Sequence, residues 1–251
     1  AASGTAAGFV IAQGTDTLEE TAYLLDLLYD GEAPVVVTGA MRHPEMAGAD
    51  GPANLLAAVR TAASPQARNL GVLVVFSDEI HAARHIQKVH TTSTCAFASP
   101  GAGPIGHVVE GRPRLHFTVH RQPTIALPFS RSAAVEVIET TLGSSCTLLN
   151  SASGLDGLVI AAFGAGHVPQ RWTGILEELA ARIPVVLTSR TGAGSVLTST
   201  YGFVGSESDL LRRGLINGGA LHPRKARLLL LALLRAGADR TEVLAAFDAR
   251  R

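Results

Sequence analysis

The chain has 251 residues, of which 47% are hydrophobic and only 17% are charged. Disordered chains combine low hydrophobicity with high net charge, so this composition excludes disorder and supplies enough apolar material for one large core or two modest ones. Basic and acidic residues both number 21, which argues against a nucleic-acid-binding chain, because such chains usually carry a basic excess. No apolar run reaches the ~18 residues that a membrane helix needs.

The first half of the chain alternates short runs rich in valine and isoleucine with amphipathic stretches. Such runs suit strands buried on both faces, and apolar residues at helical spacing suit the helices that cover them. The expected strands are residues 9–13, 34–39 and 71–76, and the expected helices between them are residues 17–29 and 52–63. Alternation of this kind predicts a parallel sheet with right-handed crossovers.

Glycine and proline become frequent beyond residue 100. Residues 108–119 predict a hairpin that turns near Gly111, and residues 122–131, with two prolines and no periodicity, predict an interdomain linker. The alternation then resumes, with expected strands at residues 134–138, 157–162 and 184–189 and expected helices at 172–182, 225–236 and 241–250. The sequence therefore predicts an α/β protein with an N-terminal domain at residues 1–121 and a smaller one at 132–251.

Gly14, Thr15 and Asp16 stand where the first predicted strand ends and the first helix begins. Open α/β sheets bind ligands at this place, glycine permits a tight turn and close approach, and the unpaired N–H groups of a helix start favour an anion or an oxyanion. A plainer alternative is that Asp16 and Glu19 form a capping box, or that Thr15 or Asp16 simply caps the helix.

Lysine is rare in this chain, which contains only Lys88 and Lys225. A buried lysine can lose its proton and act as a base, which arginine cannot do, and a threonine hydroxyl is a weak nucleophile until a base removes its proton. Thr15, Lys88 and Asp16 are therefore candidates for a set of hydroxyl, base and orienting carboxylate. The alternative for Lys88 is a solvated surface lysine, as most lysines are.

Three stretches resemble, in order and spacing, the bacterial-type L-asparaginase/glutaminase family: GTDTLEETA at residues 14–22, VVVTGAMR at 35–42 and ADGPANL at 49–55. The similarity continues at residues 88–92, 103–106, 201–203 and 223–228, and so covers nearly the whole chain. It implies two three-layer α/β domains with largely parallel sheets. It also implies hydrolysis of the side-chain amide of L-asparagine, and often of glutamine, to the acid and ammonia.

The resemblance also assigns roles to single residues. Thr15 matches the threonine of the family's Thr–Lys–Asp set, which either attacks the substrate or activates water, and Lys88 matches its lysine. Asp16 matches the carboxylate that grips the α-ammonium group of the substrate, and Ala40 matches a position whose carbonyl lies near the leaving amide. Gly14 completes the expected substrate-binding set. The family implies a homodimer or homotetramer with sites at subunit interfaces, a small amino-acid substrate, no nucleic-acid or membrane partner, and neither cofactor nor metal.

The sequence departs from the family pattern at its start. The family carries a second essential threonine in a T-G-G-T-I strand, followed by a loop with a tyrosine, and residues 1–8 match neither. The N-terminal domain is therefore expected to lack its first strand and loop. Because the chain opens with Ala1, the favoured explanation for the missing strand is that the full protein has a segment upstream of this sequence. The sequence does not decide the cellular compartment, although the cytoplasm is slightly favoured. Alternatives are an impaired amino-acid-binding relative or an amidotransferase subunit.

Other features carry weaker signals. Where some family members have Gly-Asn-Gly-Asn, residues 164–167 of this chain are Gly-Ala-Gly-His. Tyr201 is the nearest match to a glutamate that, in some members, reaches into the site of the neighbouring subunit. Both departures leave open whether the protein prefers asparagine or glutamine as its substrate. His81 and His85 have the i, i+4 spacing of some zinc sites, but no third ligand completes a familiar set. The glycines of residues 164–166 only weakly suggest a dinucleotide loop. Cysteines 95 and 146 are expected to be buried and inert.

Overall fold

The computed structural model describes residues 6–251 of the chain. Residues 1–5, which belong to the segment expected to differ from the family's opening strand, lie outside the described residues. The fold divides into two compact units, the first ending at Thr124 and the second beginning at Ile125. This boundary falls within the segment predicted as a linker.

The first unit is built on a six-stranded sheet in the order β1-β2-β3-β4-β7-β8. Its strands are β1 Phe9–Ala12, β2 Val35–Thr38, β3 Val72–Phe76, β4 Glu79–Ala82, β7 Gly106–Val109 and β8 Arg112–Leu115. The first three are parallel, and the remaining neighbours pair antiparallel. The change of direction follows from the two-residue turn at Ser77 and Asp78, which both have positive φ and so form the tight hairpin that joins β3 to β4.

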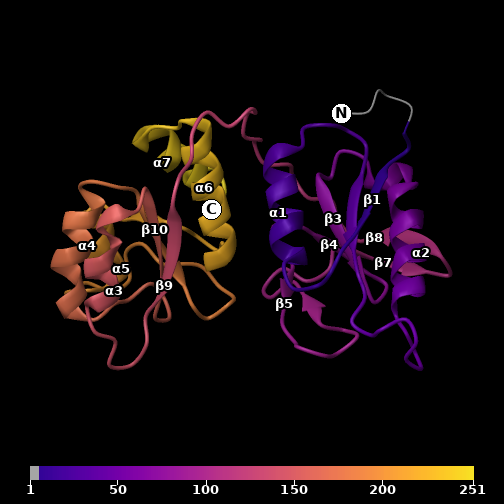
Figure 1. Cartoon of the computed structure of the whole chain (residues 1–251), viewed down its shortest axis with the longest axis horizontal. Helices are drawn as coiled ribbons and strands as arrows, with labels where there is room; N and C mark the ends of the chain where they lie inside the picture. Colours follow the sequence, from indigo (N-terminus) through magenta and orange to yellow (C-terminus); the bar gives the residue numbers. More distant parts are fainter. Residues whose placement is uncertain (1–5) are drawn as a thin grey trace. The chain divides into compact units, whose positions relative to one another are not determined.

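Two helices cover the two faces of this sheet, as Figure 1 shows. The helices are α1 Leu18–Leu28 and α2 Gly51–Ala62, and a short 3-10 turn at Pro65–Ala67 follows α2. Alternate residues of β3 point to opposite faces. Val72, Val74 and Phe76 pack in the core under α1, whereas Leu73 and Val75 pack in the core under α2.

A small hairpin lies on the same face as α1. It consists of β5 Gln87–Lys88 and β6 Phe97–Ala98, in which Lys88 pairs with Phe97. Phe97 is buried and packs against Phe76 of the main sheet, with ring centroids 4.7 Å apart. The hairpin is thus fixed to the sheet by an aromatic contact, which places Lys88 near the start of α1.

The second unit contains a four-stranded, fully parallel sheet in the order β12-β11-β10-β9. Its strands are β9 Val135–Glu139, β10 Gly157–Ala162, β11 Val185–Ser189 and β12 Ile216–Asn217. Its helices are α3 Thr147–Asn150, α4 Thr173–Ala180, α5 Glu207–Arg212, α6 Pro223–Ala236 and α7 Arg240–Asp248, with 3-10 turns at Ser151–Gly154 and Gln170–Trp172. In Figure 1, α6 covers one face of this sheet and α3, α4 and α5 cover the other, so the unit has three layers.

The α/β fold class is confirmed, and the long elements lie close to where the sequence predicts them. The hairpin turns at Glu110 and Gly111, both with positive φ, as expected near Gly111. The helix expected at 172–182 is shorter and begins at Thr173, after a 3-10 turn. The short elements β4, β5, β6, β12, α3 and α5 were not predicted. Within residues 6–251, every helix is too short or too polar to cross a bilayer.

Candidate functional site

The loop between β1 and α1 lies at the carboxyl end of β1 and carries Thr15 and Asp16. The backbone N–H of Gln13 donates to Thr38 O at 3.0 Å, so the loop is fixed to the end of the neighbouring strand β2. Gly14 does not adopt a left-handed conformation, and a Cβ at this position would meet no atom within 4 Å. Gly14 therefore faces open space, and its backbone does not need the conformational freedom that a tight turn would require.

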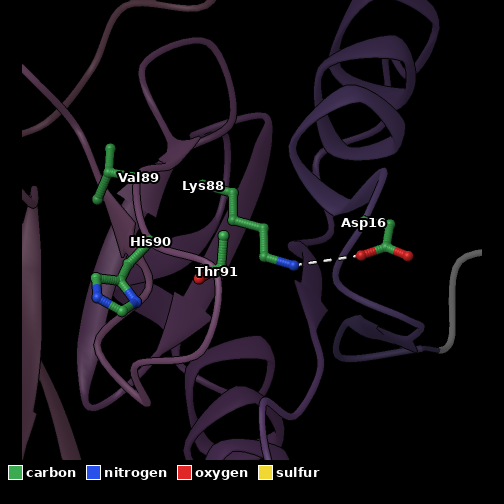
Figure 2. Close-up of a pocket in the computed structure, with 5 residues that line it drawn as sticks. All are labelled: Asp16, Lys88, Val89, His90 and Thr91. Atoms are coloured by element: carbon green, nitrogen blue, oxygen red, sulfur yellow. Dashed lines mark hydrogen bonds and ion pairs between the residues drawn. The ribbon is translucent and has the colours of Figure 1, made fainter.

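Lys88 of β5 extends toward this loop, as Figure 2 shows. Its Nζ donates to Thr15 Oγ1 at 2.9 Å and to Asp16 Oδ1 at 3.3 Å. The lysine side chain is 20% exposed, whereas the Asp16 side chain is 99% exposed. The structure thus brings together the three residues that the sequence singled out as hydroxyl, base and carboxylate, and Lys88 is not a freely solvated surface lysine.

The capping-box alternative does not describe the start of α1. Thr17 is the N-cap residue, and no side chain caps the helix. Glu19 is buried instead, and its carboxylate accepts the backbone N–H of Lys88. Sequence reasoning missed this role of Glu19. The signal lay in its position, because Glu19 shares the inward face of α1 with Ala22 and Tyr23, three and four residues further on.

Ala40 lies in the loop that follows β2, and two side chains of the ADGPANL stretch hold that loop. The carboxylate of Asp50 accepts the backbone N–H groups of Met41 at 2.9 Å and Arg42 at 2.9 Å. Burial raises the pKa of Asp50, but these bonds and one from Asn54 outweigh it, so the pKa of this carboxyl lies below its ordinary value. The loop is therefore held by a carboxylate that stays ionised.

Asn54 connects the same loop to the end of β3. Its Nδ2 donates to Gly39 O at 3.0 Å, and its Oδ1 accepts the backbone N–H of Ser77 at 2.9 Å. Gly39 in turn lies against Thr15, since a Cβ on Gly39 would stand 3.4 Å from Thr15 Cγ2. The motif stretches at residues 35–42 and 49–55 thus converge on the loop that carries Thr15. Ala40 itself is exposed.

A cleft of about 570 Å³ opens beside these residues and is lined by Asp16, Lys88, Val89, His90 and Thr91. His90 lies on the far side of Lys88 from Asp16 in Figure 2. Its Nδ1 accepts the backbone N–H groups of Thr92 at 3.1 Å and Ser93 at 2.9 Å, so the ring orders the loop that forms one wall of the cleft. The cleft can admit a molecule of amino-acid size.

Several weaker sequence signals take a different form in the structure. His81 lies in β4 and His85 in the turn after it, so their i, i+4 spacing does not place them on one helical face. Residues 164–166 form a turn closed by a bridge between Phe163 and His167. The expectation of two buried cysteines was wrong, because Cys95 is exposed, with its Sγ 3.2 Å from Ser77 Oγ, and Cys146 is half-buried.

His167 and Tyr201, the two positions in the second unit where the sequence differs from the family pattern, are in contact, with ring centroids 4.8 Å apart. Behind them lies the buried carboxylate of Glu207, which accepts the backbone N–H groups of Thr200 and Tyr201 and contacts His167 Nε2 at 3.2 Å. Burial raises the pKa of Glu207, but these hydrogen bonds outweigh it and hold the pKa below its ordinary value. The loop that carries Tyr201 is thus fixed by an internal anion.

Comparison with known proteins gives two matches that together span most of the chain. The family model described as "Asparaginase, N-terminal" matches residues 1–121, and the one described as "Glutaminase/Asparaginase C-terminal domain" matches residues 134–247. The chain belongs to the asparaginase family. Each of the two units of this asparaginase-family chain carries one of the two matches.

Individual relatives agree with this assignment. The chain is 41% identical to a probable L-asparaginase of Deinococcus radiodurans over 93% of its own length and 73% of the relative's. It is 35% identical to L-asparaginase 2 of Escherichia coli over 96% of its own length and 70% of the relative's. It is also 35% identical to a glutaminase-asparaginase of Pseudomonas aeruginosa over 94% and 66% of the two lengths.

Proposed function

We propose that this asparaginase-family chain hydrolyses the side-chain amide of L-asparagine to aspartate and ammonia, with L-glutamine as a possible second substrate. The observation that carries the proposal is the contact of Lys88 Nζ with Thr15 Oγ1 at 2.9 Å and with Asp16 Oδ1 at 3.3 Å, at the edge of a cleft. The names of the relatives, which include L-asparaginases and glutaminase-asparaginases, support the same activity.

In the proposed reaction, the amine of Lys88 accepts the proton of the Thr15 hydroxyl. The oxygen then either attacks the amide carbon directly or activates a water molecule that does so. The C–N bond breaks when the tetrahedral intermediate collapses, and the amide nitrogen leaves as ammonia after it gains a proton. One water is consumed overall. If Thr15 is the nucleophile, that water hydrolyses the ester that links Thr15 to the acyl group.

Asp16 is assigned to the α-ammonium group of the substrate. Its carboxylate is almost fully exposed, so its contact with Lys88 is largely solvated and holds it only weakly. It is therefore available to accept hydrogen bonds from a second cation in the cleft. Gly14 and Ala40 are assigned to the surroundings of the substrate through their backbone groups, because each lies in a loop beside Thr15.

We further propose that residues 1–121 and 132–251 act as separate domains joined by residues 122–131, and that the active protein is a homodimer or homotetramer with sites at subunit interfaces. All of the assigned groups lie within residues 1–121. The high exposure of Asp16 supports completion of the site by a second copy. Analytical ultracentrifugation tests the assembly, and a monomer at assay concentration with full activity would contradict it.

The function is tested by ammonia release from L-asparagine and L-glutamine. Wild type is compared with Thr15→Ala and Lys88→Ala, and with His43→Gln as a control at an exposed position outside the cleft. We expect both site variants to lose turnover by at least about a hundredfold, because each removes a reacting group. Unchanged turnover in both would overturn the mechanism.

A second candidate is a protein that binds the amino acid without converting it. Calorimetric binding of L-aspartate or L-asparagine, weakened by Asp16→Asn and accompanied by no ammonia release, would support this candidate. Ammonia release by wild type would exclude it.

A further inference from the structure

A network of hydrogen bonds crosses the interior of the first unit beside the hairpin that carries Lys88. His81 of β4 is fully buried, and its Nδ1 lies 2.9 Å from the hydroxyl of Ser99. Its Nε2 lies 3.1 Å from Glu79 Oε2. Both ring nitrogens of a buried imidazole are thus engaged, one by a residue that follows β6 and one by its own strand.

The sheet geometry places this network on the same face as α1 and the small hairpin. His81 pairs with Val74, and Glu79 pairs with Phe76, so all four side chains point to one face of the sheet. The core on that face also contains Phe97 of β6. Burying polar groups is unfavourable unless they are hydrogen-bonded. The buried imidazole of His81 therefore favours the position in which the Ser99 hydroxyl bonds to it.

Ser99 follows β6 directly, and β6 is the strand that pairs with Lys88. Phe97 lies opposite Lys88 in the ladder, and Ala96 O accepts the backbone N–H of Val89 at 2.8 Å. The hairpin therefore has two separate attachments to the main sheet: the aromatic contact of Phe97, and the Ser99–His81 hydrogen bond two residues later. The second attachment is directional, because it depends on a hydrogen bond.

The outer end of the network, Glu79, faces the neighbouring strand β7. Glu79 lies opposite His107 of β7, with Oε1 3.8 Å from His107 Nε2. The other nitrogen of His107 lies 2.9 Å from His116 Nε2. Glu79 thus lies between two histidines, and its shorter contact, at 3.1 Å, is the one with the buried His81.

We propose that Ser99 and His81 are positioning residues for Lys88, and that their hydrogen bond holds the β5–β6 hairpin where the lysine amine meets Thr15. The inference rests on the proposed function for its catalytic consequence, but its structural part does not. Neither residue lines the cleft, so both act through the hairpin. Asp16 lies on a different element, so the bond should affect the proton transfer more than the binding of substrate.

The kinetic test compares Ser99→Ala and His81→Phe with wild type. The matched control is Thr61→Val, which removes a buried hydroxyl bonded to Ala57 O at 2.9 Å on the opposite face of the same sheet. We expect kcat to fall about tenfold in both Ser99→Ala and His81→Phe with KM changed less than about twofold, because small displacements of a reacting group cost rate steeply. The double variant should lose no more than His81→Phe alone.

A second measurement is independent of activity. The chain contains only two lysines, so protein labelled with carbon-13 at lysine Cε gives two resonances by NMR, one from Lys88 and one from the fully buried Lys225. In Ser99→Ala, the Lys88 resonance should move toward that of a free lysine while the Lys225 resonance stays in place. Thr61→Val should move neither.

The two measurements separate the possible failures. If wild type releases no ammonia, the proposed function fails, and the NMR comparison still decides the positioning role. If wild type is active but Ser99→Ala keeps its kcat within twofold, or if the Lys88 resonance does not move, the positioning role is overturned. A loss of thermal stability equal to that of Thr61→Val, with kinetics unchanged, would leave the hydrogen bond a purely structural one and would also overturn it.

Discussion

Thr15 Oγ1 and Lys88 Nζ are 2.9 Å apart, although the two residues are separated by 73 positions in the chain. Three contacts bring them together: Glu19 accepts the backbone N–H of Lys88, Phe97 fixes the opposite strand of the hairpin to Phe76, and Gln13 holds the Thr15 loop to β2. Each contact joins segments that are distant in sequence, so the geometry of the pair is a property of the folded unit.

The first prediction concerns the chemical identity of the base. Lys88→Arg keeps a long basic side chain but cannot lose a proton near neutral pH, so it should not support proton transfer from Thr15. We expect kcat for ammonia release to fall by about 10²- to 10⁴-fold. Thr15→Ser, which keeps the hydroxyl, should retain more activity than Lys88→Arg. An arginine variant within tenfold of wild type would show that proton transfer to residue 88 is not required.

The second prediction concerns substrate binding. Asp16→Asn removes the negative charge assigned to the substrate's α-ammonium group and keeps the shape of the side chain. Hydrogen bonds to charged groups contribute about 1.5–3 kcal/mol, so KM for L-asparagine should rise about ten- to a hundredfold. The control is Asp30→Asn, another exposed aspartate in the same unit, which should leave KM unchanged. Steady-state ammonia assays measure both, and an unchanged KM in Asp16→Asn would refute the assignment.

The third prediction concerns stability. Asn54 is buried and connects Gly39, Asp50 and Ser77 through its side chain. Asn54→Ala leaves those groups without this partner, which should lower the free energy of unfolding by about 1–3 kcal/mol. Urea denaturation measures the change. Ala53→Ser, at the neighbouring exposed helix position, should change it by less than about 0.5 kcal/mol.

The fourth prediction concerns pH and His222, the N-cap residue of α6. Its Nδ1 accepts the backbone N–H of Arg224 at 3.3 Å. Burial, with the positive charges of Arg224 and Lys225, lowers the pKa of His222 from 6.5 to about 4. The unfolded chain therefore binds a proton below about pH 6.5 that the folded chain refuses until about pH 4, so this group makes the fold less stable as pH falls through that range.

The measurement is urea denaturation of wild type and His222→Asn between pH 4 and pH 7. Asparagine can cap the helix but does not titrate, so the variant should lose stability less steeply as pH falls. His120→Asn, at an exposed position in the first unit, should follow wild type. If the free energies of unfolding of wild type and His222→Asn changed in parallel with pH, His222 would bind its proton equally well in the folded and the unfolded chain, which would contradict the prediction.

The elements with regular patterns could be predicted from the sequence. The strands β2 and β3 are recognised because they are unbroken runs of apolar, mostly β-branched residues. Helix α1 is recognised because its apolar stripe is long enough to show a period. The strands β5 and β6 have two residues each and show none. Glu19 was misread for a related reason, since an acidic residue in a first helical turn usually serves the helix itself.

The sequence by itself determined the α/β class, the place of Thr15 and Asp16 at the end of the opening strand, and the rarity of lysine that drew attention to Lys88. These features are local or compositional, so they can be read without coordinates. Only the tertiary structure decided that Lys88 meets Thr15, that Glu19 binds the backbone of Lys88, and that Ser99 and His81 share a hydrogen bond. Those contacts depend on which distant segments meet, and the choice of packing partner leaves no periodic trace in the chain.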